Sequence, residues 1–214
     1  MAAAWQALAW QARAHCLCPP PMEPRLTVHD LACRRGDRLL FRGLSFELAP
    51  GEVLQVAGAN GTGKSSLLRI VAGLLRPFEG RVTFASSIGL LDDRLPLDEH
   101  LPLGQAFAVW NRLSGGVYSP GAFASVGLDG LLDVPVRYLS TGQRKRTALL
   151  LTAAAYPALW LLDEPLNGLD AAGVALVLDE LRAFREHGGM AIVASHQPLD
   201  VPDLRRLDLA EFAA

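Results

Sequence analysis

The sequence predicts an α/β domain with a mainly parallel sheet and helices on both of its faces. Two observations support this prediction. Short apolar runs typical of buried strands alternate with runs whose apolar residues recur at helical spacing, which favours parallel strands joined by helices. A glycine-rich segment, residues 58–65, also lies between one such strand and one such helix. The 214 residues are enough for one domain of this kind.

The N-terminal part of the chain predicts an antiparallel β subdomain. Residues 26–28 and 44–48 have the pattern of two short strands, and residues 34–37 have the composition of the turn between them. Ahead of these strands, three consecutive prolines at 19–21 indicate a break in regular structure. We therefore expect residues 1–23 to form a disordered leader and residues 24–214 to form a single domain.

Beyond this subdomain, strand and helix patterns alternate. The expected strands are 53–57, 80–84, 87–91, 159–162 and 191–194, and the expected helices are 66–75, 142–155 and 171–186. Residues 98–136 depart from the alternation, because they contain two short helical runs separated by glycines. They predict a small inserted helical subdomain.

Composition excludes several classes of protein. The 20 Lys and Arg residues are balanced by 22 Asp and Glu residues, so the basic excess usual in nucleic-acid binders is absent and we expect no nucleic-acid partner. The three cysteines all lie in the first 33 residues and make no disulfide framework, which favours a reducing setting. The longest apolar stretch is too short to span a bilayer.

Residues 58–65 match the phosphate-loop pattern G-x-x-x-x-G-K-[ST] at every fixed position. Glycines let backbone N–H groups surround a polyphosphate, and the N-terminus of the following helix adds partial positive charge. We expect Lys64 to reach the β- and γ-phosphates and the Ser65 hydroxyl to contribute to a magnesium shell. The motif predicts a nucleoside-triphosphate site of the P-loop NTPase class. Its expected residues are Gly58, Ala59, Asn60, Gly61, Thr62, Gly63, Lys64, Ser65 and Ser66.

Two acids follow the apolar strand pattern at 159–162. The carboxyl ends of parallel strands line the ligand crevice, so Asp163 is expected near the phosphates, where it would hold magnesium. Glu164 would orient a water molecule for attack on the γ-phosphate. Asp-Glu after an apolar strand is weak alone, because a strand that runs out into a polar loop has the same pattern. The phosphate loop about a hundred residues earlier favours the functional interpretation.

Residues 139–143 read Leu-Ser-Thr-Gly-Gln at the start of an expected helix, where Ser140 would be the N-cap. The pattern Leu-Ser-x-Gly-Gln, between a phosphate loop and an Asp-Glu strand, resembles the signature motif of the nucleotide-binding subunits of ATP-binding-cassette (ABC) transporters. Residues 167–170 resemble the D-loop of that family, and His196 resembles its switch histidine. The resemblance covers residues 25 to about 200.

This resemblance implies an ATP hydrolase that uses Mg2+, with Lys64, Glu164 and His196 as the catalytic residues. In the family, the signature of one subunit meets the γ-phosphate bound by another, so the resemblance implies a homodimer associated with integral membrane transporter subunits. The signature residues that would bind nucleotide in this way are Ser140, Thr141, Gly142 and Gln143.

Segments 34–41, 44–52, 161–173 and 195–199 resemble more narrowly the haem-exporter ATPases of cytochrome c maturation. This likeness implies haem export, driven by ATP-dependent dimer closure, and a peripheral location on the cytoplasmic side of the inner membrane. Nothing in the composition or spacing indicates haem. The alternatives are an ATPase of another small-substrate transporter, a nucleotide-binding regulatory module with weak turnover, and a soluble ABC ATPase of DNA repair or translation.

Three residues depart from the family pattern. Asp92, followed by Asp93, stands where the family has a glutamine, and we expect Asp92 still to contact magnesium. Arg35 falls near the position of the aromatic residue that stacks on adenine, and its guanidinium could stack on a base. Thr141 replaces a signature glycine. Since the predicted catalytic residues remain, we expect hydrolysis to survive.

For two further features, a purely structural role competes with a functional one. Phe107 and Trp110 in the helical insert are expected either to contact a membrane subunit or to form the core of the insert, with little to separate the two. Residues 144–146, Arg-Lys-Arg, are expected to form a solvated helix face rather than an anion site.

Overall fold

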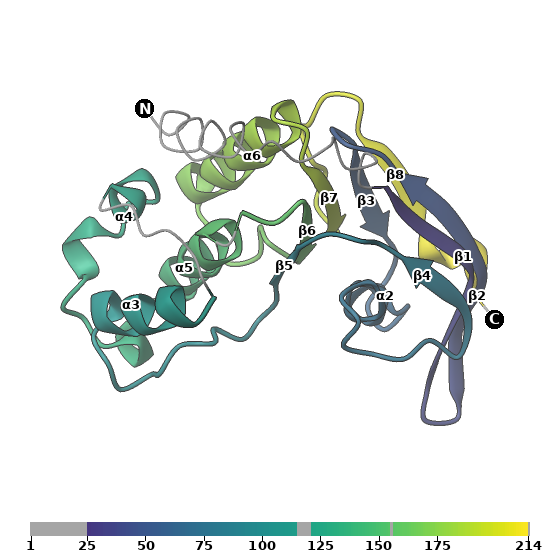
Figure 1. The fold of residues 1–214 in the computed structure, drawn as a ribbon, viewed down its shortest axis with the longest axis horizontal. Coiled ribbons are helices and arrows are strands. Elements are labelled where there is room, and N and C mark those ends of the chain that lie inside the picture. The colour runs from purple at the N-terminus through teal and green to yellow at the C-terminus, as the bar shows by residue number, and fades with distance from the viewer. Residues whose placement is uncertain (1–24, 115–120, 155, 214) are drawn as a thin grey trace.

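The computed structural model of the chain describes residues 25–114, 121–154 and 156–213. The expected leader, residues 1–23, lies outside the described residues, and so do residues 115–120 of the expected insert. Figure 1 shows the described residues as two sheets with helices packed around them. Within these residues, no helix is both long enough and apolar enough to cross a membrane.

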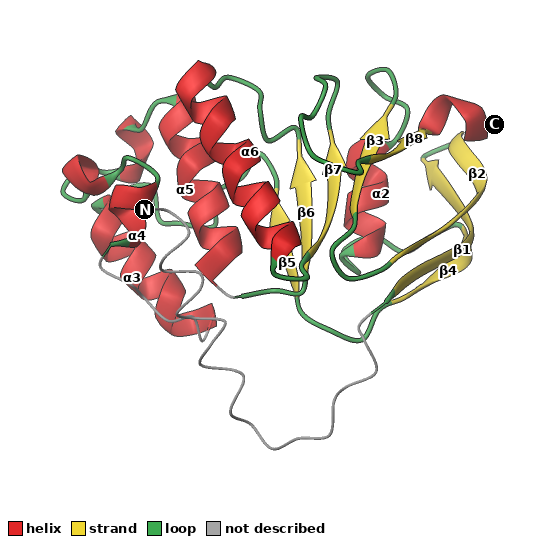
Figure 2. Ribbon diagram, turned by 90° about the horizontal axis from the view of Figure 1, so that it is seen from above, coloured by secondary structure: helices red, strands yellow, loops and turns green. Residues whose placement is uncertain are grey.

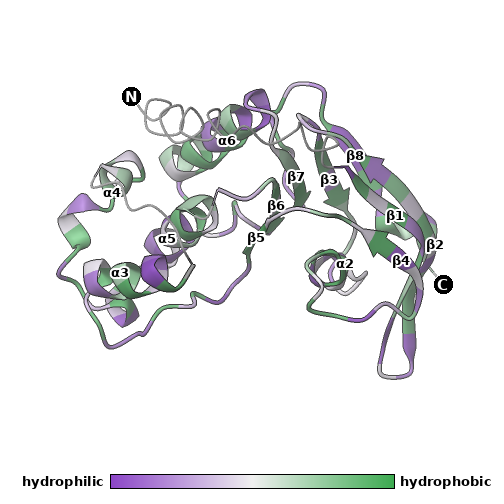
Figure 3. Cartoon of the chain, viewed as in Figure 1, coloured by the Kyte–Doolittle hydropathy of each residue, from purple (hydrophilic) through white to green (hydrophobic). Residues whose placement is uncertain are grey.

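Five parallel strands form the larger sheet, in the order β5-β6-β7-β3-β8. They are β3 (Val53–Ala57), β5 (Ile88–Leu91), β6 (Leu159–Asp163), β7 (Met190–Ala194) and β8 (Arg205–Asp208). The prediction of a mainly parallel sheet is confirmed. Three strands, β3, β6 and β7, are buried along their whole length. Figure 3 shows these strands as predominantly hydrophobic, as expected when helices cover both faces of a parallel sheet.

Helices cover both faces of this sheet, as predicted. The helices are α2 (Lys64–Val71), α3 (Leu103–Ser114), α4 (Ala122–Ser125), α5 (Thr141–Ala154) and α6 (Ala171–Glu186). Successive side chains of a strand point to opposite faces. In β6, Leu159 and Leu161 pack in the core that contains α2, whereas Trp160 and Leu162 pack in the core that contains α5 and α6. Figure 2 shows α2 on one side of the sheet and α5 and α6 on the other.

The smaller sheet is antiparallel, as predicted, in the order β2-β1-β4. Its strands are β1 (Leu26–Arg35), β2 (Arg38–Leu48) and β4 (Glu79–Thr83). β1 and β2 are longer than the expected strands at 26–28 and 44–48, because their pairing continues to Arg35 and Arg38 beside the turn. Buried side chains of β1 and β2 share one core with α2 and the parallel strands. The helix therefore packs between the two sheets.

Among the described residues, the helical part at 98–136 packs in a third core, to which α5 also contributes Leu150, Leu151 and Ala154. Phe107 of α3 and Phe123 of α4 are both buried there, with ring centroids 4.9 Å apart in an edge-on arrangement. Phe107 therefore belongs to the core of the insert, which decides between its two interpretations. Trp110 is only partly buried and packs at the edge of this core.

Two elements differ from the sequence predictions. The helix expected at 66–75 spans Lys64–Val71. It ends early because Gly73, at a φ of +73°, takes the left-handed conformation that commonly terminates helices, while the N–H groups of Leu74 and Leu75 turn back to the Arg69 carbonyl. β8 was not predicted from the sequence. Its four residues include two arginines and are exposed or half-buried, so they have no apolar pattern.

Candidate functional site

The phosphate loop runs from the carboxyl end of β3 to the N-terminus of α2, where three of its glycines have positive φ. A Cβ atom at Gly58 would lie 2.8 Å from the Thr62 hydroxyl oxygen, and one at Gly63 would lie 3.1 Å from the Phe41 ring. Thr62 closes the loop by donating from its hydroxyl to the Ala59 carbonyl at 2.9 Å. Backbone conformation and close packing therefore both require glycine in this loop.

Lys64, Glu164 and His196 converge beside the loop. The Lys64 side chain is only 7% exposed, and its ammonium donates to the Gly58 carbonyl at 2.8 Å. The same ammonium lies 3.6 Å from Glu164 Oε1 and 2.9 Å from His196 Nε2. His196 Nε2 in turn lies 3.1 Å from Glu164 Oε1 and 2.8 Å from Asn60 Oδ1. The tautomer of His196 decides whether Nε2 accepts from the lysine or donates to these oxygens.

Glu164 has a backbone φ of +46°, a region that non-glycine residues rarely occupy. The Glu164 N–H donates to the Ala194 carbonyl at 2.9 Å, so the conformation is held by the end of the neighbouring strand β7. Among the described residues, neither carboxylate oxygen of Glu164 meets the geometry of a hydrogen bond, although both oxygens are buried. Oε1 lies within ion-pair distance of Lys64 and His196, so Oε2 is the oxygen that a water molecule or a ligand could engage.

Asp163 ends strand β6 and is buried next to Ser65. Burial raises the pKa of the Asp163 carboxyl above its ordinary value, and a hydrogen bond from the Ser65 hydroxyl lowers it in part. Its Oδ1 atom has no hydrogen-bond partner in the described part of the chain. A free carboxylate oxygen beside a hydroxyl suits Mg2+, which usually takes one or two protein ligands together with phosphate oxygens. The described residues contain no dedicated cluster of three or more metal-binding side chains.

A cavity of about 220 Å³ lies over the phosphate loop. It is lined by residues of the loop and of the start of α2, together with Leu40 of β2 and Glu164, the residue after β6. The lining residues are Leu40, Ala59, Asn60, Gly61, Gly63, Lys64, Ser65, Ser66 and Glu164. The structure thus gathers most of the predicted phosphate-binding residues around one space, together with the predicted Glu164.

Arg35 lies outside the lining of this cavity, exposed at the end of β1. Burial raises the pKa of the nearby Cys33 thiol, and a hydrogen bond with Ser66 of the loop and the charge of Arg35 lower it in part. The structure therefore does not join the Arg35 side chain to the residues that line the phosphate cavity.

The signature residues at 140–143 begin α5, outside the lining of the phosphate cavity. The Ser140 N–H donates to Gln143 Oε1 at 2.8 Å and the Gln143 N–H donates to Ser140 Oγ at 3.3 Å, which is a reciprocal capping box. Thr141 packs against the D-loop, since a Cβ atom at Gly168 would lie 2.9 Å from Thr141 Cγ2. Within one chain, then, the signature does not reach Lys64.

Asp92 is directed to other partners than Ser65 and Asp163. Its Oδ1 atom accepts from the Arg94 N–H at 2.9 Å, and its Oδ2 atom lies 3.7 Å from Arg69 Nη2 of α2. It also lies outside the lining of the phosphate cavity. The structure therefore does not join Asp92 to the other residues expected to hold magnesium.

The expectation of a solvated helix face at 144–146 is wrong for Lys145, whose side chain is only 10% exposed. Its ammonium lies 3.1 Å from Asp93 Oδ1 and 3.5 Å from the Asp163 carbonyl oxygen. Both interactions are long-range in sequence, so no local pattern indicated them.

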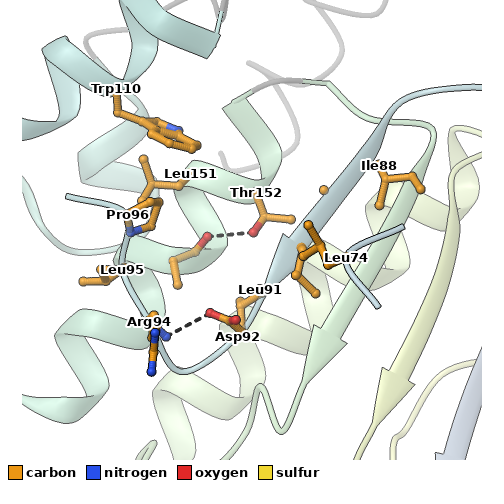
Figure 4. A pocket seen from close by; sticks show the side chains of 13 residues that line it. Leu74, Ile88, Leu91, Asp92, Arg94, Leu95, Pro96, Trp110, Leu151 and Thr152 are labelled. Carbon is orange, nitrogen blue, oxygen red and sulfur yellow. Dashed lines mark hydrogen bonds between the residues drawn. The ribbon is translucent and has the colours of Figure 1, made fainter. Parts of the chain in front are cut away.

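A larger groove of about 600 Å³, with a mostly apolar lining, lies beside β5. Figure 4 shows Trp110, Pro96 and Leu151 on one side and Leu74 and Ile88 on the other. Trp110 Nε1 is buried and has no hydrogen-bond partner among the described residues. The lining consists of Leu74, Ile88, Gly89, Leu90, Leu91, Asp92, Arg94, Leu95, Pro96, Trp110, Ala148, Leu151 and Thr152. Of these lining residues, only Trp110 was predicted from the sequence as a possible contact for a partner.

The ABC transporter family model matches residues 41–167. The chain is 53% identical over 187 residues to the cytochrome c biogenesis ATP-binding export protein CcmA of Novosphingobium aromaticivorans, covering 87% of this chain and 96% of the relative. It is 49% identical over 191 residues to the CcmA of Zymomonas mobilis, covering 89% and 86%. Among solved structures, a metal-chelate type ABC transporter in an inward-facing conformation is similar, with a TM-score of 0.73, 27% identity, and coverage of 87% of this chain and 80% of that one.

Proposed function

Because the chain belongs to the ABC transporter ATP-binding family, we propose that it is the ATP-hydrolysing subunit of an exporter of cytochrome c biogenesis. One observation carries the proposal of hydrolysis: Lys64, Glu164 and His196 meet at the phosphate loop of a chain that is closely similar to curated ATP-binding export proteins. The names of these relatives support a role in cytochrome c biogenesis, and the geometry of the three side chains supports ATP hydrolysis.

Each residue of the site has a separate role in the proposed reaction. Lys64 and the loop N–H groups would stabilise charge on the transferred γ-phosphoryl group. The buried carboxylate of Glu164, whose Oε2 atom has no polar contact among the described residues, would accept a hydrogen bond from the attacking water and so orient it. His196 Nε2, already within 3.1 Å of Glu164 Oε1, would contact the γ-phosphate on the same side. Ser65 and Asp163 would hold Mg2+, which neutralises phosphate charge when bound.

We also propose that two copies close around two nucleotides. The N-terminus of α5 carries the exposed Ser140 and Thr141, which lie outside the lining of the phosphate cavity of their own chain. A helix N-terminus favours anions, so the signature of one copy suits the γ-phosphate bound by the other. In this arrangement each site is complete only in the dimer.

The groove beside β5 is the proposed contact with integral membrane transporter subunits. Its apolar lining suits an apolar segment of a partner. We place the chain peripherally on the cytoplasmic side of the inner membrane. Haem as the exported species rests only on the resemblance of segments 34–41, 44–52, 161–173 and 195–199 to haem-exporter ATPases.

Three measurements test the proposal. The purified chain should release phosphate from Mg-ATP, and Glu164→Gln should trap an ATP-bound dimer on a sizing column, because the nucleotide binds but water is not oriented. In cells that lack their own CcmA-like protein, the chain should restore c-type cytochrome maturation, and Lys64→Ala should not. Equal background phosphate release by the wild type and Lys64→Ala would instead favour a nucleotide-binding regulatory module.

A further inference from the structure

The two aspartates that follow β5 contact helices on opposite faces of the parallel sheet. Asp92 Oδ2 lies 3.7 Å from Arg69 Nη2 of α2, the helix of the phosphate loop. Asp93 Oδ1 lies 3.1 Å from Lys145 Nζ of α5, the helix of the signature motif. The segment 92–96, called here the 92–96 loop, is therefore tied to both helices that begin with a nucleotide-binding motif.

Lys145 has a position that stability alone does not explain. A buried ammonium is costly unless it is well paired, and an apolar side chain of similar volume is often as stable or more stable in its place. Yet the side chain of Asp93 is 89% exposed, and pairs with so exposed a carboxylate contribute little. The second contact of Lys145, at 3.5 Å, is with the carbonyl oxygen of Asp163, the residue proposed to hold Mg2+.

We propose that Lys145 is a positioning residue for ATP hydrolysis, which holds the end of β6 in place through the Asp163 carbonyl and links it to the 92–96 loop through Asp93. Four residues of this loop, Asp92, Arg94, Leu95 and Pro96, also line the groove beside β5, as Figure 4 shows. This inference rests on the proposed hydrolysis of ATP.

The first experiment uses the full chain with Lys145→Met and Lys145→Arg. Residues that position a metal ligand typically affect metal affinity or activity 10- to 100-fold. We expect Lys145→Met to lower kcat about tenfold and to raise the Mg2+ concentration for half-maximal hydrolysis at least about threefold. Binding of a fluorescent ATP analogue without Mg2+ should change less than about twofold, because phosphate-loop contacts remain. Lys145→Arg keeps the charge and should restore most of the activity.

The matched control is Arg182→Gln. Arg182 on α6 pairs with Asp179 and Asp200, away from the phosphate cavity and the groove, so its loss should leave kcat and the Mg2+ requirement unchanged. Wild-type rates no higher than those of Lys64→Ala would overturn the proposed function itself. An active wild type with a Lys145→Met variant that matches it in both kcat and Mg2+ requirement would overturn only the role of Lys145.

A second variant keeps the test decisive if Lys145→Met folds poorly. Asp93 is largely exposed, so Asp93→Ala should fold normally. It should raise the Mg2+ requirement about threefold, and the same change in a Lys145→Met background should add little, because both act through one contact. An unchanged Mg2+ requirement in Asp93→Ala, or effects that simply multiply in the double variant, would contradict the inference.

Discussion

Each face of the parallel sheet buries one of the two lysines of this chain, and the two lysines differ in how they are held. Lys64 lies on the α2 face and sits among backbone carbonyls and side chains of the phosphate loop, six residues or fewer from Gly58 and Ala59. Lys145 lies on α5, on the opposite face, and reaches partners 52 and 18 residues away in sequence. The carbonyl contacts of Lys64 thus come from one contiguous segment, although Glu164 and His196 also reach its ammonium from distant parts of the chain. The contacts of Lys145 depend on how three separate elements come together.

The largest effect should come from the local site. Lys64→Ala removes the ammonium that lies within 3.6 Å of Glu164 and 2.9 Å of His196. Loss of a group that stabilises transition-state charge typically costs 10²–10³ in rate, so phosphate release should fall about 100- to 1000-fold. Steady-state phosphate release with saturating Mg-ATP measures this. A loss smaller than that of Lys145→Met would reverse the ranking of the two lysines.

The next prediction compares two glycines of the same loop. Gly63 has a φ of +108° and a substituent Cβ would lie 3.1 Å from the Phe41 ring, whereas Gly61 has a φ of +80° with no described atom within 4 Å of that position. Gly63→Ala combines strain with a steric conflict and should lower the free energy of unfolding by about 2–3 kcal/mol, and Gly61→Ala by about 1 kcal/mol. Denaturant titrations of both variants give the difference. Equal losses would mean that the Phe41 ring moves aside freely.

The third prediction concerns the pH dependence of stability and Glu180 of α6, on the sheet face opposite α2. Burial, with a smaller contribution from Asp179, raises the pKa of Glu180 from 4.5 to about 7. The folded chain therefore binds this proton more tightly than the unfolded chain. The resulting stability is fully present below the unfolded pKa and is lost as pH rises through about 7.

Glu180→Gln should abolish this dependence, because the amide does not titrate. Between pH 5 and pH 8, the free energy of unfolding of the wild type should fall by about 2 kcal/mol more than that of Glu180→Gln. Thermal or denaturant unfolding across this range measures both slopes, and all other titrating groups cancel in the comparison. Parallel curves would show that Glu180 is solvated in the folded chain.

The same contrast explains what the sequence could predict. The conformation of residues 58–65 is determined within the segment, by its glycines and by the hydrogen bond from the Thr62 hydroxyl to the Ala59 carbonyl. Strands β3, β6 and β7 were also predictable, since burial on both faces leaves continuous apolar runs. Information of this kind is local, and it located the phosphate loop and Asp163.

Long-range contacts were not predictable in this way. Three consecutive charged residues at 144–146 predicted solvent exposure, but consecutive residues of a helix point in different directions, and Lys145 points toward the end of β6. Whether that direction is solvent or protein depends on the 92–96 loop. Asp92 likewise resembles a metal ligand by its place in the family pattern, yet Arg69 and the Arg94 N–H engage its carboxylate.

The smallest effect concerns the signature end of α5, where Ser140 has two proposed roles. As an N-cap it exchanges hydrogen bonds with Gln143, so Ser140→Ala should cost about 1 kcal/mol of unfolding free energy. Ser140→Asp keeps the cap and should restore stability, but it places a negative charge where the γ-phosphate of a second copy is proposed to lie. In a Glu164→Gln background, Ser140→Asp should therefore be stable and yet fail to dimerise with ATP on a sizing column. ATP-dependent dimers that form normally with Ser140→Asp would show that this helix N-terminus does not face the partner's nucleotide. Helix capping would then be the one role left for Ser140.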